Sequence, residues 1–208
     1  MTWSLGEISA LATKAARGSG MEWGLAEEAG YAVKWLQRRE LPGVAALCRY
    51  LSWRQSGTLS AWPDKTGERG HYCPIAIGAA YGDGAFGDEV QLQRIRLPLL
   101  LIPFVALRAF DKSITVSMGD AVFGLTRDGF GHSANSTAIL VNSSVCNITT
   151  KHEALPLITS INDIRWPRVP ETTTDCIKVL NKFAKNTYAP ATETSRLAGA
   201  GAGLNDGD

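Results

Sequence analysis

Apolar positions recur at helical spacing through the first fifty residues and predict three helices. Residues 4–7, Ser-Leu-Gly-Glu, match a capping box, in which a serine and a glutamate three positions later satisfy each other's free amides. We therefore expect a helix over about 4–17 and, after a glycine break, a second over about 23–39. A proline placed to open a helix predicts a third over about 42–51.

The segment over 52–72 has no periodicity and predicts a long irregular loop, which in a compact domain is more often functional than idle. Pro74 at a first helical position, with Cys73 as N-cap, predicts a short helix through Tyr81. A buried strand is the alternative, because periodicity does not separate the two for a short apolar run. A second glycine-rich loop follows over 82–89.

From Val90 the pattern changes toward a period of two, although 90–97 does not alternate cleanly. We interpret 99–110 as a buried apolar run inside a β-rich block, in which 128–131 forms a turn. Thr173 or Thr174 can cap a last helix that ends near residue 185. The other strands that we expect are 114–118 and 121–126, paired as a hairpin, then 137–141 and 145–149.

These elements predict an α+β fold, with an N-terminal helical layer packed on a central, mostly antiparallel sheet and followed by a C-terminal helix and a glycine-rich tail. We expect one domain over 1–188. The tail over 189–208 has little reason to order alone, so we expect it to dock on this domain or on a neighbouring subunit.

The composition is that of an ordinary globular protein, with 208 residues, 45% hydrophobic and 20% charged. A net charge of +1 without a basic block disfavours nucleic acid as a partner. The longest apolar run is interrupted by Pro98, Pro103 and Arg108, and the start is not a secretory signal. We therefore expect a cytoplasmic protein without a membrane partner.

Four cysteines are widely separated: Cys48, Cys73, Cys146 and Cys176. In a reducing compartment each is expected to be a small buried hydrophobe. His71 next to a helix-capping Cys73 allows another reading, with Cys73 as a nucleophile and His71 as its acid–base partner. The inert, buried Cys73 is the reading that we favour, and the three histidines lack metal-ligand spacing, so we predict no metal site.

The stretch from residue 14 to residue 28 concentrates charge around a glycine break. Free amides at the start of the second helix, with Arg17, could hold a carboxylate or phosphate, and Glu27 or Glu28 could act as a base. The simpler alternative is a helix–helix turn whose acids stabilise a helix N-terminus. The substrate-binding residues that we predict are Arg17, Gly18, Gly20, Trp23 and, from the tail, Arg196.

Two stretches resemble a family of uncharacterised proteobacterial proteins known only as a domain of unknown function. They are Lys14-Ala-Ala-Arg-Gly-x-Gly with Trp23-Gly-Leu-Ala-Glu-Glu-Ala near the start, and Thr187-Tyr-Ala-Pro-Ala-Thr-Glu-x-Ser-Arg with Gly-Ala-Gly-Ala-Gly near the end. The resemblance runs over the full length and implies a self-standing bacterial protein. It brings no activity, and the cofactor stays unknown.

We predict a cytoplasmic enzyme, a lyase, isomerase or hydrolase, that acts on a small anionic metabolite such as a carboxylate. Its catalytic candidates are Glu27, Glu28, His71 and Cys73, framed by the loops 52–72 and 82–89. The alternative is a non-catalytic binding or assembly protein, a homo-oligomer whose tail and aromatic side chains contact a partner subunit. The two readings differ in whether the charged groups converge on one site.

Overall fold

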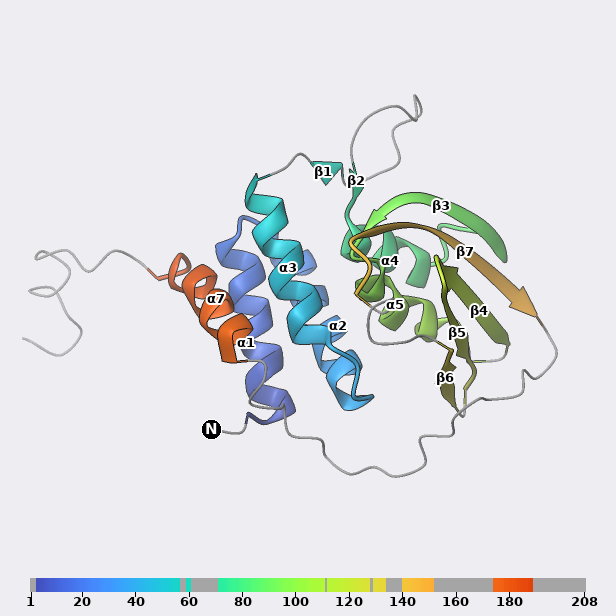
Figure 1. Ribbon diagram of the computed structural model, residues 1–208, viewed down its shortest axis with the longest axis horizontal. Coiled ribbons are helices and arrows are strands. Elements are labelled where there is room, and N and C mark those ends of the chain that lie inside the picture. Colours follow the sequence, from blue (N-terminus) through green and yellow to red (C-terminus); the bar gives the residue numbers. More distant parts are fainter. Residues whose placement is uncertain are drawn as a thin grey trace, which may run out of the picture.

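The computed structural model describes residues 3–56, 59–60, 71–110, 112–127, 129–133, 140–151 and 174–188. Helices lie on one side of the molecule and a curved sheet on the other, with two short helices between them (Figure 1). This arrangement confirms the predicted α+β fold. The helical elements are α1 (Leu5–Gly18), α2 (Trp23–Arg38), α3 (Gly43–Ser56), α4 (Pro74–Gly82), η1 (Pro98–Leu101), α5 (Ile102–Leu107) and α7 (Thr174–Lys185). The strands are β1 (Leu59–Ser60), β2 (His71–Tyr72), β3 (Glu89–Arg96), β4 (Ser113–Met118), β5 (Ala121–Leu125), β6 (Phe130–His132) and β7 (Ser143–Lys151).

The predicted helix starts are confirmed at α1 and α4. Ser4 accepts a hydrogen bond from the Glu7 amide at 3.2 Å, and the Glu7 carboxylate accepts one from the Ser4 amide at 2.8 Å. At α4 the Cys73 sulfur accepts a hydrogen bond from the Ala76 amide, with Pro74 in the first turn. The helix alternative for 74–81 is therefore correct and the strand alternative is wrong.

Three helices end in the same Schellman arrangement, in which a left-handed residue after the C-cap closes the last turn. Gly20 takes this position after α1 with φ 87°, and Gly84 takes it after α4 with φ 85°. After α2 the position belongs to Glu40, with φ 57°. The glycine break at Gly20 is thus first of all a helix terminus, which explains its place in the sequence.

The helical layer places the first helix, α1, in contact with both α2 and the last helix, α7. Glycines permit close approach on both sides. A side chain at Gly30 would collide with Thr13, and one at Gly18 would collide with the Phe183 carbonyl of α7. The Asn186 amide group also donates to the Gly18 carbonyl at 3.0 Å. These contacts hold the C-terminal helix against the N-terminal one.

The apolar run that we placed in the β-rich block is helical, and it forms η1 and α5. Its residues are apolar on every side because the run lies between the helical layer and the sheet, and α5 packs so tightly on α4 that Phe104 fills the space beside Gly78. The run is also not buried to its end. Leu107 is 55% exposed and Phe110 is 66% exposed.

The sheet has the order β1-β2-β3-β7-β4-β5-β6. Its two pairings at the β1 end are parallel and the other four are antiparallel, which confirms a mostly antiparallel sheet. Alternate residues of β5, Ala121, Phe123 and Leu125, are buried, whereas Val122 is exposed. The predicted hairpin is β4–β5, and the predicted strand 145–149 is the middle of β7.

A β-bulge explains why 90–97 does not alternate cleanly. Leu92 pairs with Cys146 and Ile95 with Ser144, so β3 advances three residues while β7 advances two. Arg94 is the left-handed residue in this bulge, with φ 51°. The extra residue turns Ile95 back into the core and leaves Arg94 and Arg96 on the opposite face.

Two further boundaries differ from the prediction. The third helix continues to Ser56, so the irregular segment is shorter than 52–72 and also contains β1 and β2. The loop residues 61–70, most of the predicted strand 137–141 and the tail 189–208 lie outside the described residues.

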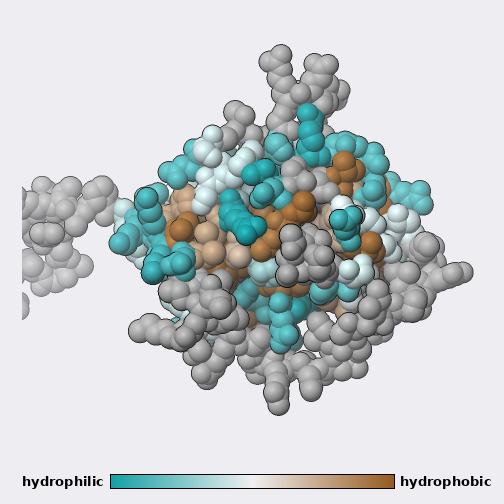
Figure 2. All heavy atoms as spheres, in the orientation of Figure 1, coloured by the Kyte–Doolittle hydropathy of each residue, from teal (hydrophilic) through white to brown (hydrophobic). Residues whose placement is uncertain are grey.

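Among the residues that are described, none of the helices has the length and hydrophobicity needed to cross a membrane. The face in Figure 2 mixes hydrophilic and hydrophobic residues in small areas.

Candidate functional site

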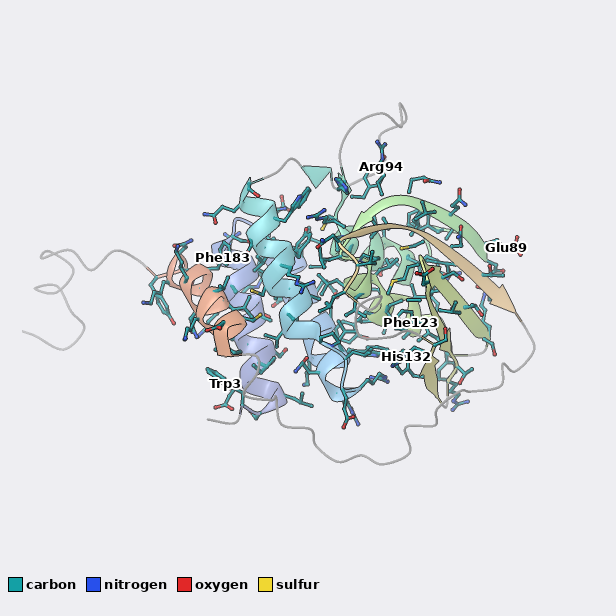
Figure 3. The ribbon with its side chains drawn as sticks, viewed as in Figure 1. Trp3, Glu89, Arg94, Phe123, His132 and Phe183 are labelled. Carbon is teal, nitrogen blue, oxygen red and sulfur yellow. The ribbon has the colours of Figure 1, made fainter. Side chains whose placement is uncertain are left out.

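Cationic and aromatic side chains gather where the end of α3 meets β2 and β3. Because β2 and β3 are parallel and Tyr72 pairs with Ile95, His71 lies on the same face as Arg94 and Arg96. Figure 3 shows Arg94 at this end of the sheet, far from Glu89 at the other end of β3. Helix α3 completes the group with Trp53. We call Trp53, His71 and Arg96 the arginine–histidine cluster.

Trp53 contacts both other members of the cluster. The Trp53 and His71 ring centroids are 5.4 Å apart in an edge-to-face arrangement. The guanidinium carbon of Arg96 lies 4.6 Å from the centroid of the Trp53 ring, a cation–π distance. Trp53 therefore holds both the imidazole and the guanidinium in place.

Arg96 has donor capacity to spare. Its Nε is buried and donates to no acceptor among the residues that the structure describes. Burial lowers the pKa of Arg96 relative to that of a free arginine, since the charged form loses water contacts. A guanidinium with an unused, desolvated N–H is suited to an anion, because a carboxylate or phosphate accepts its planar donors.

His71 is the titratable member of the cluster. Its pKa is lowered, first by burial and then by the positive charges of Arg96 and Arg94. At neutral pH the imidazole is therefore uncharged and can accept a proton. An anion placed against Arg96 would offset the two positive charges and raise the pKa of His71 again.

Cys73 is buried two positions after His71, and a series of contacts leads from it to the α1–α2 turn. The Tyr50 hydroxyl donates to the Cys73 sulfur at 2.8 Å, and the positive charge of Arg54 acts on the same hydroxyl. Arg54 also donates to the Gly20 carbonyl at 3.4 Å. Burial and the Cys73 thiol raise the pKa of Tyr50, so its hydroxyl stays protonated and remains a donor. These contacts connect two candidates from the sequence, Gly20 and Cys73. The third, His71, lies two positions before Cys73.

The residues predicted to bind substrate at the α1–α2 turn have structural partners. Arg17 donates to the Met21 carbonyl at 2.9 Å, Gly18 contacts α7 and Gly20 closes α1. Trp23 is 61% exposed. Arg196 lies outside the described residues. The arrangement favours the simpler interpretation of this turn, a helix–helix connection.

The predicted glutamates lie away from the cluster. Glu27 is exposed. The pKa of Glu28 is raised by burial first, then by the charges of Asp83 and Glu27. Asp83 caps the C-terminal end of α4, whereas Cys73 caps its N-terminal end, and the helix between them separates the two by about 15 Å. The structure thus divides the predicted catalytic residues between the two ends of α4.

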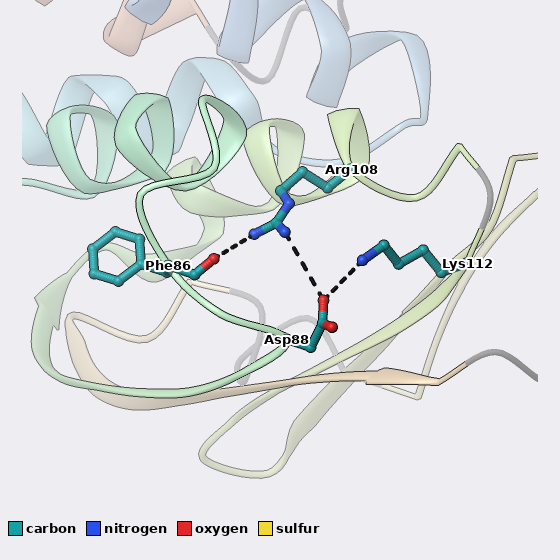
Figure 4. Close-up of polar contacts among 4 residues, drawn as sticks. All are labelled: Phe86, Asp88, Arg108 and Lys112. Atoms are coloured by element: carbon teal, nitrogen blue, oxygen red, sulfur yellow. Dashed lines mark hydrogen bonds and ion pairs between the residues drawn. The ribbon is translucent and has the colours of Figure 1, made fainter.

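The glycine-rich loop 82–89 is fixed by charged contacts (Figure 4). Arg108 donates to the Phe86 carbonyl at 2.8 Å, and the Asp88 carboxylate lies 2.8 Å from the Lys112 ammonium and 3.9 Å from Arg108. The Asp88 carbonyl also accepts a bond from the Thr150 amide at 2.9 Å. Asp88 is thus a structural anchor, and over the described ranges no group of three acidic, histidine or cysteine side chains could hold a metal ion.

The sequence prediction identified His71 but missed Trp53, Arg96 and Arg54. Trp53 and Arg54 lie in the last turn of α3, beyond the end that we predicted for this helix. The signal for Arg96 was present as Arg94-Ile-Arg96, two cations at strand spacing next to core residues. Only the pairing of β3 with β2 brings it to His71.

A model for a family described as "Protein of unknown function (DUF3726)" matches residues 3–69. This match, over about a third of the chain, confirms the resemblance to a domain of unknown function. It contains α1, α2 and α3 with Trp53, and it ends before His71 and Arg96. Searches of curated proteins and of solved structures found no match.

Proposed function

We propose that the protein is a cytoplasmic enzyme that binds a small anionic metabolite at the arginine–histidine cluster, with His71 as the acid–base group. Arg96 takes the role that the sequence prediction gave to Arg17 and Arg196. A carboxylate or phosphate of the substrate accepts hydrogen bonds from Arg96, and the reacting carbon or oxygen lies next to the imidazole. The substrate class and the reaction, a lyase, isomerase or hydrolase step, are those predicted from the sequence.

The observation that supports this proposal best is the unused Nε–H of Arg96 beside a neutral imidazole. A buried donor without a partner costs about 1–3 kcal/mol, which a bound anion would recover. The neutral His71 can take a proton from a substrate, and the negative charge of the bound anion would then stabilise the resulting imidazolium. Cys73 is left out of the chemistry because it is buried and accepts hydrogen bonds from Tyr50 and Ala76.

The test is a calorimetric titration of the full chain with inorganic phosphate and with small mono- and dicarboxylates at low salt. We expect saturable binding that weakens about 10- to 100-fold in Arg96→Gln, the range expected for the loss of one charged hydrogen bond. Arg127→Gln is the matched control. Arg127 also stacks on an aromatic ring, with 4.5 Å to the Phe110 centroid, but it lies outside the cluster.

His71→Asn separates binding from catalysis. We expect it to retain ligand binding within a few-fold and to abolish turnover of a bound substrate. If Arg96→Gln and Arg127→Gln bind every anion equally well, the site is wrong. If the anions bind but His71→Asn turns substrate over at the rate of the unaltered protein, the assignment of the acid–base group is wrong.

The second candidate is a non-catalytic assembly protein, in which exposed aromatic side chains contact another subunit. Trp23, Phe110 and Tyr188 are each more than 60% exposed, and this observation favours it. Light scattering coupled to size exclusion distinguishes this candidate. A homo-oligomer that dissociates in Trp23→Ala or Tyr188→Ala, together with a protein that binds no anion, would favour assembly over catalysis.

A further inference from the structure

A second arginine of β3 lies beside the arginine–histidine cluster. Ile95 pairs with Tyr72 of the parallel strand β2. The residues that precede this pair, Arg94 on β3 and His71 on β2, therefore lie at the same level of the two strands. The guanidinium carbon of Arg94 is 6.0 Å from the centroid of the Tyr72 ring. On the basis of the anion site proposed above, we propose that the substrate carries two negative charges, as a phosphate monoester or a dicarboxylate does, and that Arg94 selects it over a monoanion.

The backbone of Arg94 has a conformation that usually belongs to glycine. Its φ is 51°, and it lies in the β-bulge between Leu92 and Ile95. A bulge residue in the left-handed region is commonly glycine, because a side chain there costs free energy. Such strain persists only where the surrounding structure holds it, and it concentrates at ligand-binding sites.

Two other residues with a side chain have a positive φ in the described part of the chain, and each has a local reason. Glu40 closes the last turn of α2, where its amide donates to the Gln37 carbonyl at 3.2 Å. Leu97 has a φ of 46° and a side chain that is 1% exposed, so burial in the core offsets its strain. Arg94 differs from both because its half-buried side chain carries a positive charge next to His71. The side chain kept at this strained position is therefore one that can meet an anion.

The charges around the imidazole favour a dianion. The pKa of His71 is lowered by burial first and then by Arg96 and Arg94, so both guanidinium groups act on the same ring. A monoanion would offset one of these positive charges, whereas a dianion offsets both. Each planar guanidinium also presents paired donors, and two of them match the oxygens of one phosphate or of two carboxylates.

The test compares dianions with monoanions of nearly the same shape, in calorimetric titrations of the full chain at low salt and about pH 8, where both kinds of dianion carry two charges. The two pairs of probes are succinate with succinamate and methyl phosphate with dimethyl phosphate. We expect at least one dianion to bind about 10- to 100-fold more tightly than its monoanionic counterpart, the range for one additional charged hydrogen bond. The pair that shows the larger ratio identifies the substrate as a dicarboxylate or as a phosphate monoester.

Substitutions of Arg94 separate its role in binding from its strain. Arg94→Gln should reduce the ratio to about 2-fold and leave monoanion binding nearly unchanged, whereas Arg94→Lys should keep part of the ratio because it retains the charge without the planar donors. Arg94→Gly should lose the ratio and raise the melting temperature by roughly 1–4 °C, because glycine removes the strain. Glu40→Gly is the matched control, since it relieves the same kind of strain outside the cluster. It should raise the melting temperature similarly and keep the ratio.

The outcomes distinguish this inference from the anion site on which it rests. If both members of each pair bind equally and Arg96→Gln weakens them all, the anion site stands and the selection of a dianion is overturned. A preference for a dianion that survives in Arg94→Gln would overturn the role of Arg94. If no probe binds, or if Arg96→Gln changes nothing, the anion site is wrong and this inference is overturned with it.

Discussion

At the scale of single residues, backbone conformation decides which positions tolerate substitution. Gly20 and Glu40 occupy the same left-handed position after α1 and α2, but only one is glycine. We predict that Glu40→Gly raises the free energy of unfolding by about 0.5–1 kcal/mol, because it removes the strain of a side chain there. Gly20→Ala should lower it by about 1–2 kcal/mol, although nothing lies within 4 Å of the added carbon. Urea denaturation measures both, and changes of the same sign would contradict the explanation.

A second prediction at the residue scale concerns how the pKa of His71 makes stability depend on pH. Its folded-state pKa lies below the unfolded value of about 6.5, so between the two values the unfolded chain binds the proton and the folded chain does not. Stability therefore falls as the pH is lowered from about 6.5 toward the folded-state pKa. The unaltered protein should lose more stability between pH 7.5 and 5.5 than His71→Asn does. Parallel pH profiles of the two proteins would refute the assigned environment of His71.

At the scale of elements, the contact between α1 and α7 depends on one missing side chain. Gly18→Ala places a methyl group against the Phe183 carbonyl, so α7 must move away. We expect this variant to lose about 1–3 kcal/mol of stability and its α7 amides to exchange hydrogen faster. Gly6→Ala is the control in the same helix. Gly6 is exposed and has room for the methyl group, so its substitution should stabilise α1 by about 0.5–1 kcal/mol.

The elements that sequence periodicity predicts well are those whose signals are local. The capping box of α1, the proline of α4 and the β4–β5 hairpin each involve residues within a few positions of one another. The run that forms η1 and α5 gave no such signal, because most of it is covered on all sides and it has no polar face to show its period. Likewise, the β-bulge interrupts the alternation of buried and exposed residues in β3, although this segment still pairs as a strand.

At the scale of the whole molecule, the candidate site was predictable only in part. His71 attracted attention through its neighbour Cys73, whereas Trp53 and Arg96 are more than forty positions apart and meet only through the β2–β3 pairing. Glu27 and Glu28 were misleading because residues that are close in the sequence lie apart from the cluster in the fold. They are near Arg17 in the sequence, but the helix directs Glu28 toward Asp83 at the far end of α4. Sequence proximity of charges therefore did not indicate a shared site.

The order of the strands and helices has a consequence for synthesis on the ribosome. Among the described residues β7 is the last strand, yet it lies between β3 and β4, and the last described helix, α7, packs on the first. At about 5–20 residues per second, α1 emerges roughly 8–30 s before α7 does. Until β7 and α7 have been made, the edges of β3 and β4 that will pair with β7 stay unpaired, and the side of α1 that packs on α7 stays uncovered. The nascent chain thus exposes apolar surface and open strand edges, features that promote aggregation, until its final third has been translated.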